Sequence, residues 1–323
     1  MKFRIATEAF RVTGSIPTPV VSSDTPLPNM DTPRPAPGLP MRPEEAEPEL
    51  IVVEPRTSFS LGDSQELWRY RELFYYLMLR ELKLRYKQTI LGVGWSLFQP
   101  IATVMVFVIF IGYMGKTADN VDNYVLYVLL GVIPWTFFSS AMANAGNSLL
   151  ANERLVTKVY FPRLLLPLSN VGSAFVDFLI SCGLIGIAML WFGVAPAWTI
   201  VFAPFVLSLL FLTATGFGVL LSALIVAQRD FRYLLTFGTQ LWMFATPCIY
   251  LGPDAVGPAA RMILPLNPLY GLIYNLRILV LGDRPMDNFA WYSLAISGSV
   301  GLCVLFLGLF YFRRVERTFA DTI

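Results

Sequence analysis

The sequence predicts an all-α polytopic membrane protein with six transmembrane helices, an N-terminal interfacial helix and a re-entrant outer segment before the last span. Three observations support this fold class: long apolar runs, the placement of Lys and Arg around them, and a composition that is 55% hydrophobic and 14% charged. A helix needs about 20 residues to cross a bilayer, and it must satisfy its own backbone hydrogen bonds there. The expected spans are Trp95–Met114, Tyr124–Leu150, Leu164–Phe192, Ile200–Ala227, Tyr233–Leu251 and Phe289–Phe312.

Lys and Arg residues set the expected orientation, because cytoplasmic loops carry more of them than the opposite side. Fourteen flank the spans on one side: Arg69, Arg71, Arg80, Lys83, Arg85, Lys87, Arg154, Lys158, Arg163, Arg229, Arg232, Arg313, Arg314 and Arg317. The other side has four: Lys116, Arg261, Arg277 and Arg284. The rich side is therefore expected to be cytoplasmic, and six spans place both termini there.

The rest of the composition argues against several function classes. The chain has no histidine, and Cys182, Cys248 and Cys303 lie in separate apolar runs, so neither a metal site nor a disulfide framework is expected. A net charge of +2 gives no argument for nucleic-acid binding. Gly115–Thr117 resembles the end of a phosphate-binding loop, but Phe110 stands where that motif needs glycine. We expect no nucleotide-binding motif and no catalytic residue.

Residues 1–62 are predicted to form a disordered, Pro-rich cytoplasmic tail. Residues 13–55 include 11 prolines, and such a composition cannot bury a hydrophobic core. No cleavable signal peptide is visible, because Met1–Val12 lacks a useful apolar core. The tail is interpreted as a dispensable extension, with partner binding as the alternative. Residues 313–323 are expected to form a second cytoplasmic tail.

Residues 63–90 are predicted to form an amphipathic helix that lies in the cytoplasmic interface. Leu67–Gln88 contains neither Pro nor Gly, and many of its basic residues share one face at helical spacing. The remaining positions are mostly aromatic or aliphatic, which suits headgroup depth. A plain basic juxtamembrane segment is the alternative. The candidate cations are Arg80, Lys83, Arg85 and Lys87.

Residues 91–312 are predicted to form the transmembrane domain, and the loop at about 151–167 is its most unusual cytoplasmic connection. It mixes charge with apolar residues that a loop would expose, which suits a short helix docking into a groove on another protein. A simple positive-inside loop is an equal alternative. The residues of interest are Arg154, Lys158, Val159, Tyr160, Phe161, Pro162, Arg163 and Leu164.

The segment at about 251–288 is expected on the outer side. Its apolar stretch Leu269–Leu281 is too short to span the bilayer, so it predicts a re-entrant helix, with an amphipathic surface helix as the alternative. Non-helical backbone at that depth is tolerated only against protein or a water-filled cavity.

Polar and aromatic residues within the spans are further candidates. Asp177 is expected to face the bundle or a pore because a charge at mid-bilayer is costly, with helix packing or subunit contact as the alternative role. Gln99 and Gln240 could hydrogen-bond across helices. A flat aromatic face can stack on a sugar ring, although most such residues are lipid-facing anchors. The candidate pore aromatics are Trp95, Phe98, Phe107, Phe110, Tyr113, Trp135 and Phe138.

An ordered set of short strings resembles one known family. The strings are Arg80–Lys87, Leu91–Pro100, Lys158–Pro167, Gln228–Arg232, Thr246–Tyr250, Asn267–Tyr270 and Phe312–Ile323. From about Trp68 to the C-terminus the chain resembles the membrane-spanning permease of a bacterial ABC transporter that exports polysaccharide, such as O-antigen, teichoic acid or capsule. Residues 1–62 lie outside this resemblance.

The resemblance implies a homodimer in the bacterial inner membrane, with the pore at the dimer axis and two copies of a separate ATPase. It implies that the 151–167 loop is the coupling helix, and that the interface helix gates entry of a glycan linked to undecaprenyl pyrophosphate. The aromatics would line the pore. ATP and Mg would be bound by the partner, and this chain would hold no cofactor of its own.

Three other functions remain open on sequence alone. An ABC permease for a small hydrophobic drug or lipid would share the same spans. A membrane glycosyltransferase would need a catalytic carboxylate at a membrane face, and Asp230 beside Arg229 is the single cytoplasmic candidate near a span end. A secondary carrier often shows internal repeats, and no convincing repeat is present.

Overall fold

The computed structural model describes residues 68–87, 92, 94–113, 123–159, 161–249, 257, 262–282 and 285–316. All elements below belong to the unit Phe59–Ile323. The expected tail 1–62, Tyr160, much of 251–261 and residues 317–323 lie outside the described residues. The last helix continues through Arg313 to Glu316, past the end of the span expected at Phe312.

Every element in the described part of the chain is helical, and five helical segments are long and apolar enough to cross a membrane. They are α3 (Gly94–Phe107) with the π-helical turn η1 (Val108–Tyr113), α4 (Tyr124–Ala151), α6 (Leu165–Phe192), the 3₁₀ turn η3 (Trp198–Phe202) with α7 (Ala203–Ala227), and α11 (Asn288–Glu316). These segments agree with five of the six expected spans, and the chain is an all-α polytopic membrane protein.

The expected fifth span is shorter than predicted. α8 (Phe231–Phe244) has 14 residues and is followed by a 3₁₀ turn, η4 (Pro247–Ile249). At 1.5 Å per residue α8 is ~21 Å long, below the ~30 Å of a hydrocarbon core. The residue before a proline avoids the α-helical region, so Pro247 accounts for the early end of the helix.

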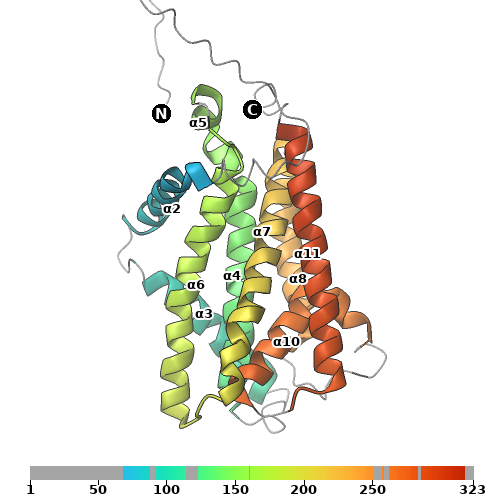
Figure 1. Cartoon of the computed structure of the whole chain (residues 1–323). Coiled ribbons are helices and arrows are strands. Elements are labelled where there is room, and N and C mark those ends of the chain that lie inside the picture. Colours follow the sequence, from blue (N-terminus) through green and yellow to red (C-terminus); the bar gives the residue numbers. More distant parts are fainter. Residues whose placement is uncertain are drawn as a thin grey trace, which may run out of the picture. The chain divides into compact units, whose positions relative to one another are not determined.

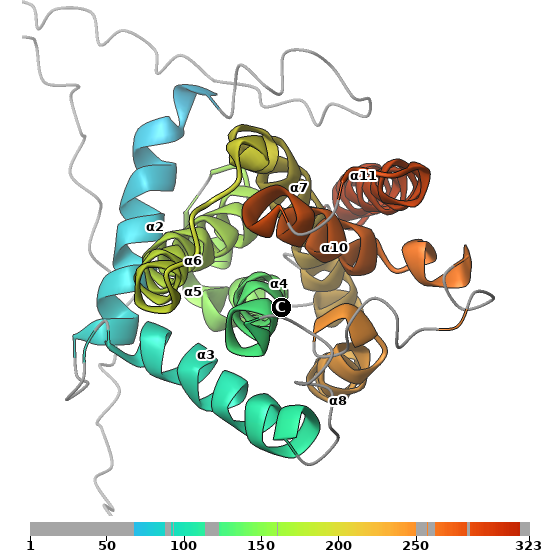
Figure 2. The same ribbon diagram turned by 90° about the horizontal axis from the view of Figure 1, so that it is seen from below.

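Two helices near the start of the described chain are strongly inclined to the long helices. Viewed down the long helices, α4, α6 and α11 appear end-on, whereas α2 (Arg71–Tyr86) and α3 appear lengthwise (Figure 2). α2 packs against α6 near the end of the bundle that also carries the short helix α5 (Glu153–Lys158) (Figure 1). A helix therefore forms in this segment, inclined to the long helices and somewhat shorter than Leu67–Gln88, and its place in the membrane interface stays a prediction.

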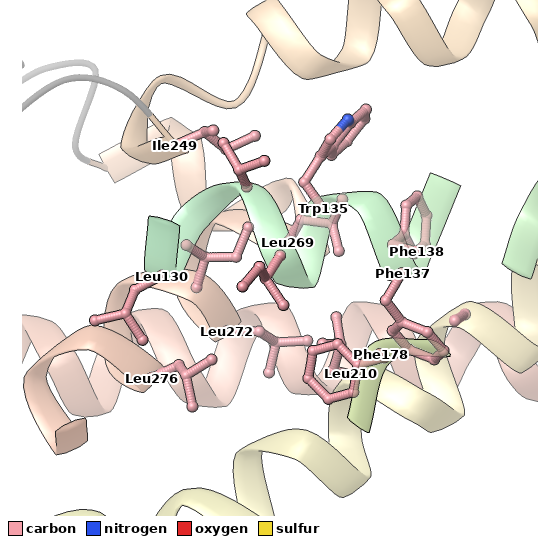
Figure 3. Packing of buried hydrophobic residues seen from close by; sticks show 14 of the residues in the cluster. Leu130, Trp135, Phe137, Phe138, Phe178, Leu210, Ile249, Leu269, Leu272 and Leu276 are labelled. Carbon is pink, nitrogen blue, oxygen red and sulfur yellow. The ribbon is translucent and has the colours of Figure 1, made fainter. Parts of the chain in front are cut away.

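α4 is the central helix of the core. It packs against α3, α6, α7, α8 and α10 (Pro268–Leu281). Buried side chains from α4, α6, α7, η4 and α10 meet in one apolar cluster (Figure 3). Among them are Leu130, Phe138, Phe178, Leu210 and Leu272.

Small residues allow α7 and α11 to approach closely, as is common where membrane helices pack. A Cβ added at Gly216 would lie 2.6 Å from the Cα of Leu305, and one at Gly308 would lie 2.6 Å from the backbone oxygen of Gly216. Neither glycine leaves space for a side chain, so both fix the distance between the two helices.

α10 occupies the expected re-entrant segment at the end of the bundle opposite α5 (Figure 1). It follows the 3₁₀ turn η6 (Leu264–Leu266), and residues 268–280 are all buried in the chain. It ends at Gly282, whose φ of 65° is the left-handed conformation that glycine adopts easily. This burial is unlike that of an amphipathic surface helix, which would leave one face exposed.

Candidate functional site

The C-terminal end of α2 is joined to α6 by a polar contact. Asp177, on α6, accepts hydrogen bonds from the Arg85 guanidinium and from the Tyr86 hydroxyl. The Arg85–Asp177 contact is also an ion pair, and both side chains are at least two-thirds buried. The intramembrane carboxylate that the sequence singled out therefore has a counter-ion from the interface helix, which lowers the cost of its burial.

Tyr86 stays a hydrogen-bond donor over the whole physiological pH range. Burial, and then its hydrogen bond to Asp177, raise the pKa of the Tyr86 phenol to about 12. The neighbouring Ser181 hydroxyl donates to the Asp177 backbone oxygen at 2.9 Å and approaches the Ser96 backbone oxygen at 3.2 Å. The cluster therefore connects α2, α3 and α6.

The four basic residues predicted for a lipid-phosphate gate divide into two pairs. Arg85 forms an ion pair with Asp177. Arg80 donates to Glu81 at 2.6 Å and to the Asn152 side chain. Lys83 and Lys87 are exposed and carry no hydrogen bond or ion pair from their ammonium groups within the part of the chain that the structure describes. They lie four residues apart on one face of α2.

The Arg80–Asn152 contact joins α2 to the start of α5, the predicted coupling helix. Arg154 and Lys158 are exposed on α5, as the sequence predicted for charged positions of that loop. Phe161 and Leu164 differ from the expectation that they are exposed, because both are buried in a second apolar cluster with Leu77 of α2. These two residues pack inside the chain and offer little surface to a partner.

Two further residues of the predicted coupling loop are half-buried. Pro162 follows the end of α5, and Arg163 donates to the backbone oxygen of Glu316 at 2.6 Å. Glu316 is the last residue of α11, so the Arg163 guanidinium lies at the C-terminus of a helix, where a positive charge is favourable. The loop is thus tied to α11 as well as to α2.

The seven candidate pore aromatics also fall into two groups. Trp95, Phe98, Phe110 and Tyr113 are exposed along α3 and η1. The other three are buried in the core: Phe107, Trp135 and Phe138. Phe138 packs edge-on against Phe217 and Trp242, with ring centroids 5.5 and 5.2 Å away. Buried aromatics stabilise the single chain, so the exposed group alone offers faces to a pore or to lipid.

A partly buried polar network supports the described residues between α8 and α10. The Asn267 side chain accepts from the backbone N–H of Leu269 and from Nε1 of Trp242, both at 3.1 Å, and donates to the Thr246 hydroxyl at 2.8 Å. Arg277 donates to the backbone oxygen of Ile249 at 2.9 Å. These side chains replace hydrogen bonds that a continuous helix would make, which backbone at membrane depth requires.

Two hollows lie beside the contacts that α2 makes with α6 and α5. One, of about 290 Å³, lies among α2, α3, α4 and α6 and is lined by residues that include Arg85, Trp95 and Asp177. The other, of about 520 Å³, is an open groove beside α5 lined by Arg80, 150–155 and 158–159. The described residues contain no group of three or more His, Cys, Asp or Glu that could hold a metal ion.

Sequence reasoning missed several residues of these sites. Asn152 and Asn267 look like ordinary loop residues, although Asn before Pro268 is a typical start of a helix. Arg277 was counted as a loop cation, but it is buried, with its guanidinium 3.6 Å from the centre of the Tyr127 ring. An arginine inside an apolar stretch of 13 residues was the available signal, because a charge there needs partners.

Comparisons with known proteins agree with this architecture. Residues 72–281 match the model of the ABC-2 type transporter family. An O-antigen export system permease protein RfbA from Myxococcus xanthus is 28% identical over 260 residues, covering 80% of this chain and 98% of that protein. A Klebsiella pneumoniae RfbA is 26% identical over 245 residues, covering 76% of this chain and 92% of its own.

The family match covers α2 through α10 and includes every contact described above except those made by α11. A second Klebsiella pneumoniae RfbA is 25% identical over 248 residues. With the family model matching well over half of its length, the chain belongs to the ABC-2 type transporter family and is a membrane permease.

Proposed function

We propose that this chain is the pore-forming permease subunit of an ATP-driven exporter that moves a lipid-linked, O-antigen-like polysaccharide out of the cytoplasm. The observation that carries this proposal is similarity to permeases named for O-antigen export, which extends over nearly their full length. The crosswise helix α2, with exposed Lys83 and Lys87, adds a place where an anionic lipid carrier can bind.

The proposed assembly has two copies of this permease and two copies of a separate ATPase chain, with the pore between the permeases. The exposed aromatics on α3 and η1 are the faces that we assign to that pore: Trp95, Phe98, Phe110 and Tyr113. They are flat and apolar, so they can contact the carbon face of a sugar without a fixed hydrogen-bond pattern. ATP and Mg²⁺ belong to the partner.

The proposed contact with the ATPase is α5 and the groove beside it. Exposed Arg154 and Lys158 present positive charge there, and exposed Val159 adds an apolar contact. Movement of α5 would reach α2 through Arg80 and Asn152, and would reach α11 through Arg163. In this proposal Phe161 supports α5 from within rather than contacting the partner.

The proposed location is the bacterial inner membrane, with both termini in the cytoplasm. The Lys and Arg residues of α2 and α5, and those in the last turn of α11, support this orientation because these parts lie at one end of the bundle (Figure 1). α8 with η4 would complete a sixth crossing. This crossing is shorter than usual, and the polar network around Asn267 supports its end. α10 would then be re-entrant from the outer side.

The test begins with purification of the chain from its native membrane and identification of what accompanies it. An ATP-binding subunit in about one-to-one ratio is expected, and the complex in liposomes should hydrolyse ATP faster when lipid-linked glycan is added. Stimulation by hydrophobic drugs and not by glycan lipid would favour a drug exporter. A stable permease with no ATPase partner, even after crosslinking at residues 151–159, would contradict the proposal.

A further inference from the structure

The groove beside α5 carries more positive than negative charge. Its charged lining residues are three cations and one carboxylate: Arg80, Arg154, Lys158 and Glu153. Arg80 is already paired with Glu81 and Asn152. Arg154 and Lys158 lie four residues apart, so they share one face of α5. Both are exposed, and neither side chain makes a hydrogen bond or ion pair within the described residues, so the groove offers two cations to an acidic ligand.

The same groove also has an apolar part. Leu150 and Leu155 line it and are half-buried, and Val159 at its edge is 53% exposed. Its volume of about 520 Å³ lies in the range of small ligand sites and is enough for a few residues of an extended peptide. A ligand that matches both parts of the groove combines carboxylates with short apolar side chains.

One segment of this chain has that composition. The segment, called the acidic stretch below, is residues 43–55 and reads PEEAEPELIVVEP. It contains five glutamates and neither Lys nor Arg, and four apolar residues, Leu50–Val53, lie between its last two glutamates. It lies outside the part of the chain that the structure describes, and its charge is opposite to that of the groove.

The acidic stretch is additional to the part of the chain that the family shares. The family match begins at residue 72, and the Myxococcus xanthus relative uses 98% of its own length to cover 80% of this chain. A permease of this family is therefore complete without such a segment. Regulation is a better assignment for it than a part in transport.

The acidic stretch is close enough along the chain to reach the groove. Fourteen residues lead from Glu54 to Trp68, where the described helical residues begin, and a chain of that length extends up to ~46 Å. Arg80 borders the groove, and the twelve residues from Trp68 to Arg80 rise only ~18 Å along the helix. The connection is therefore longer than the distance that it has to cover.

We propose that the acidic stretch docks in the groove beside α5, with glutamates on Arg154 and Lys158 and with Leu50–Val53 against Val159 and its apolar neighbours. The inference builds on the proposed function, because this groove is also the proposed contact with the ATPase. The acidic stretch and the ATPase then compete for α5. A docked acidic stretch keeps the permease from coupling until the ATPase displaces it.

The docking is tested first on the full-length permease alone, in lipid nanodiscs at low salt. A carbodiimide joins a carboxylate to an amine that touches it, and Lys158 is the lysine among the described residues that line the groove. Lys83 and Lys87 are also exposed but do not line it. Mass spectrometry of the digested product should find the acidic stretch joined to Lys158 about fivefold more often than to either lysine of α2.

A pair of arginine variants controls for the charge of the groove. Arg154→Gln keeps every group that the carbodiimide joins and removes one cation of the groove, so crosslinks to Lys158 should fall about threefold. Arg69→Gln removes an exposed cation near the start of α2, which does not line the groove. It should give the wild-type amount of crosslinks.

The competition is tested by titrating the ATPase onto the permease and measuring the half-saturating concentration. Glu44→Gln/Glu45→Gln/Glu47→Gln/Glu49→Gln should lower that concentration about fivefold at low salt, because it weakens the competitor. The difference should shrink at high salt, which screens exposed charges. Asp24→Asn/Asp31→Asn is the matched control, since it neutralises tail carboxylates outside the acidic stretch, and it should bind as the wild type does.

The outcomes separate this inference from the proposed function. Crosslinks that favour none of the three lysines, or that Arg154→Gln leaves unchanged, overturn docking in the groove. An unchanged half-saturating concentration in the glutamine variant overturns the competition, and both results leave glycan export as proposed. If neither the wild type nor the glutamine variant binds an ATPase, the proposed function and the competition fail together, while crosslinks to Lys158 still support the docking. Preferential crosslinks to Lys158 with tighter ATPase binding by the glutamine variant support the whole inference.

Discussion

The two ends of the bundle hold their polar groups in different ways. At the α2–α5 end, Arg85 meets Asp177 and Arg80 meets Asn152, so side chains of separate helices contact each other. At the opposite end, Arg277 donates to the backbone oxygen of Ile249, and Asn267 caps a helix. The first arrangement joins complete helices, whereas the second replaces hydrogen bonds missing from broken ones.

This difference assigns different mechanical roles to the two ends. A side-chain pair between complete helices can open and leave each helix intact, and partly exposed partners can find water. The backbone carbonyl of Ile249 belongs to a fully buried residue and has no such alternative, so loss of its partner carries the full cost of an unsatisfied group. We therefore expect the α2–α5 end to move and the α8–α10 region to stay fixed.

The largest expected effect is at Arg277. Arg277→Met keeps most of the side-chain length but removes the hydrogen bond to Ile249 and the cation over the Tyr127 ring. We expect a loss of about 3 kcal/mol of stability, at the lower end for breaking a buried charged contact. Thermal unfolding of the detergent-solubilised protein, followed by size-exclusion chromatography, measures this loss.

Arg232→Met is the matched control for that substitution. Arg232 is exposed on α8 and has no hydrogen bond or ion pair from its side chain in the described part of the protein. It should unfold at the wild-type temperature. Equal midpoints for the Arg277 and Arg232 variants would show that the α8–α10 region is not clamped by Arg277.

Asn267 should show the next largest effect. Asn267→Ala removes the cap of α10 and the acceptor for Trp242, so we expect a loss of about 2 kcal/mol by the same unfolding measurement. Asn267→Asp keeps both acceptor functions and loses the bond donated to Thr246, so it should lie between the alanine variant and the wild type. An aspartate variant as unstable as the alanine variant would contradict the capping role.

The limits of sequence reasoning follow the same division between regular and irregular parts. Hydropathy placed the long helices within a few residues, because each crossing segment must be apolar and helical whatever surrounds it. It overestimated α8, since apolar residues continue past Pro247 into a turn that only tertiary contacts support. The loop's mixed composition placed Phe161 on the surface. Its burial depends on packing in a cluster with Leu77 of α2, which is distant in sequence, so local sequence does not predict it.

The candidate site was predictable in its residue types and not in its pairings. Asp177 stood out as a costly intramembrane charge, but nothing local to it identifies Arg85, which is 92 residues earlier. Because such partners are not visible in the sequence, all four basic residues of α2 were assigned to one gate. The structure shows that two of them, Arg80 and Arg85, are occupied by contacts within the chain.

The Arg85–Asp177 contact between α2 and α6 should contribute less to stability than the Arg277–Ile249 contact between α10 and η4. In a double-mutant cycle of Arg85→Met and Asp177→Leu, we expect a coupling energy of about 1 kcal/mol, because both partners are only partly buried. Hydrogen–deuterium exchange of the α2 amides should rise in either single variant and leave α10 unchanged. Faster exchange throughout α10 would show that the two ends are not mechanically independent.

The last comparison separates the two exposed lysines of α2 from its two paired arginines. Lys83→Gln/Lys87→Gln should weaken the apparent affinity for undecaprenyl pyrophosphate about fivefold per lysine at low salt, since each contributes about 1 kcal/mol near an anionic surface. The loss should shrink at high salt, because exposed charges are screened. Arg80→Gln, which breaks the contact with Asn152, should instead lower the maximal ATPase rate and leave affinity and its salt dependence near those of the wild type. Equal salt-dependent losses in both variants would mean that Arg80 leaves Asn152 to bind the carrier, and the α2–α5 joint would then itself be part of the binding site.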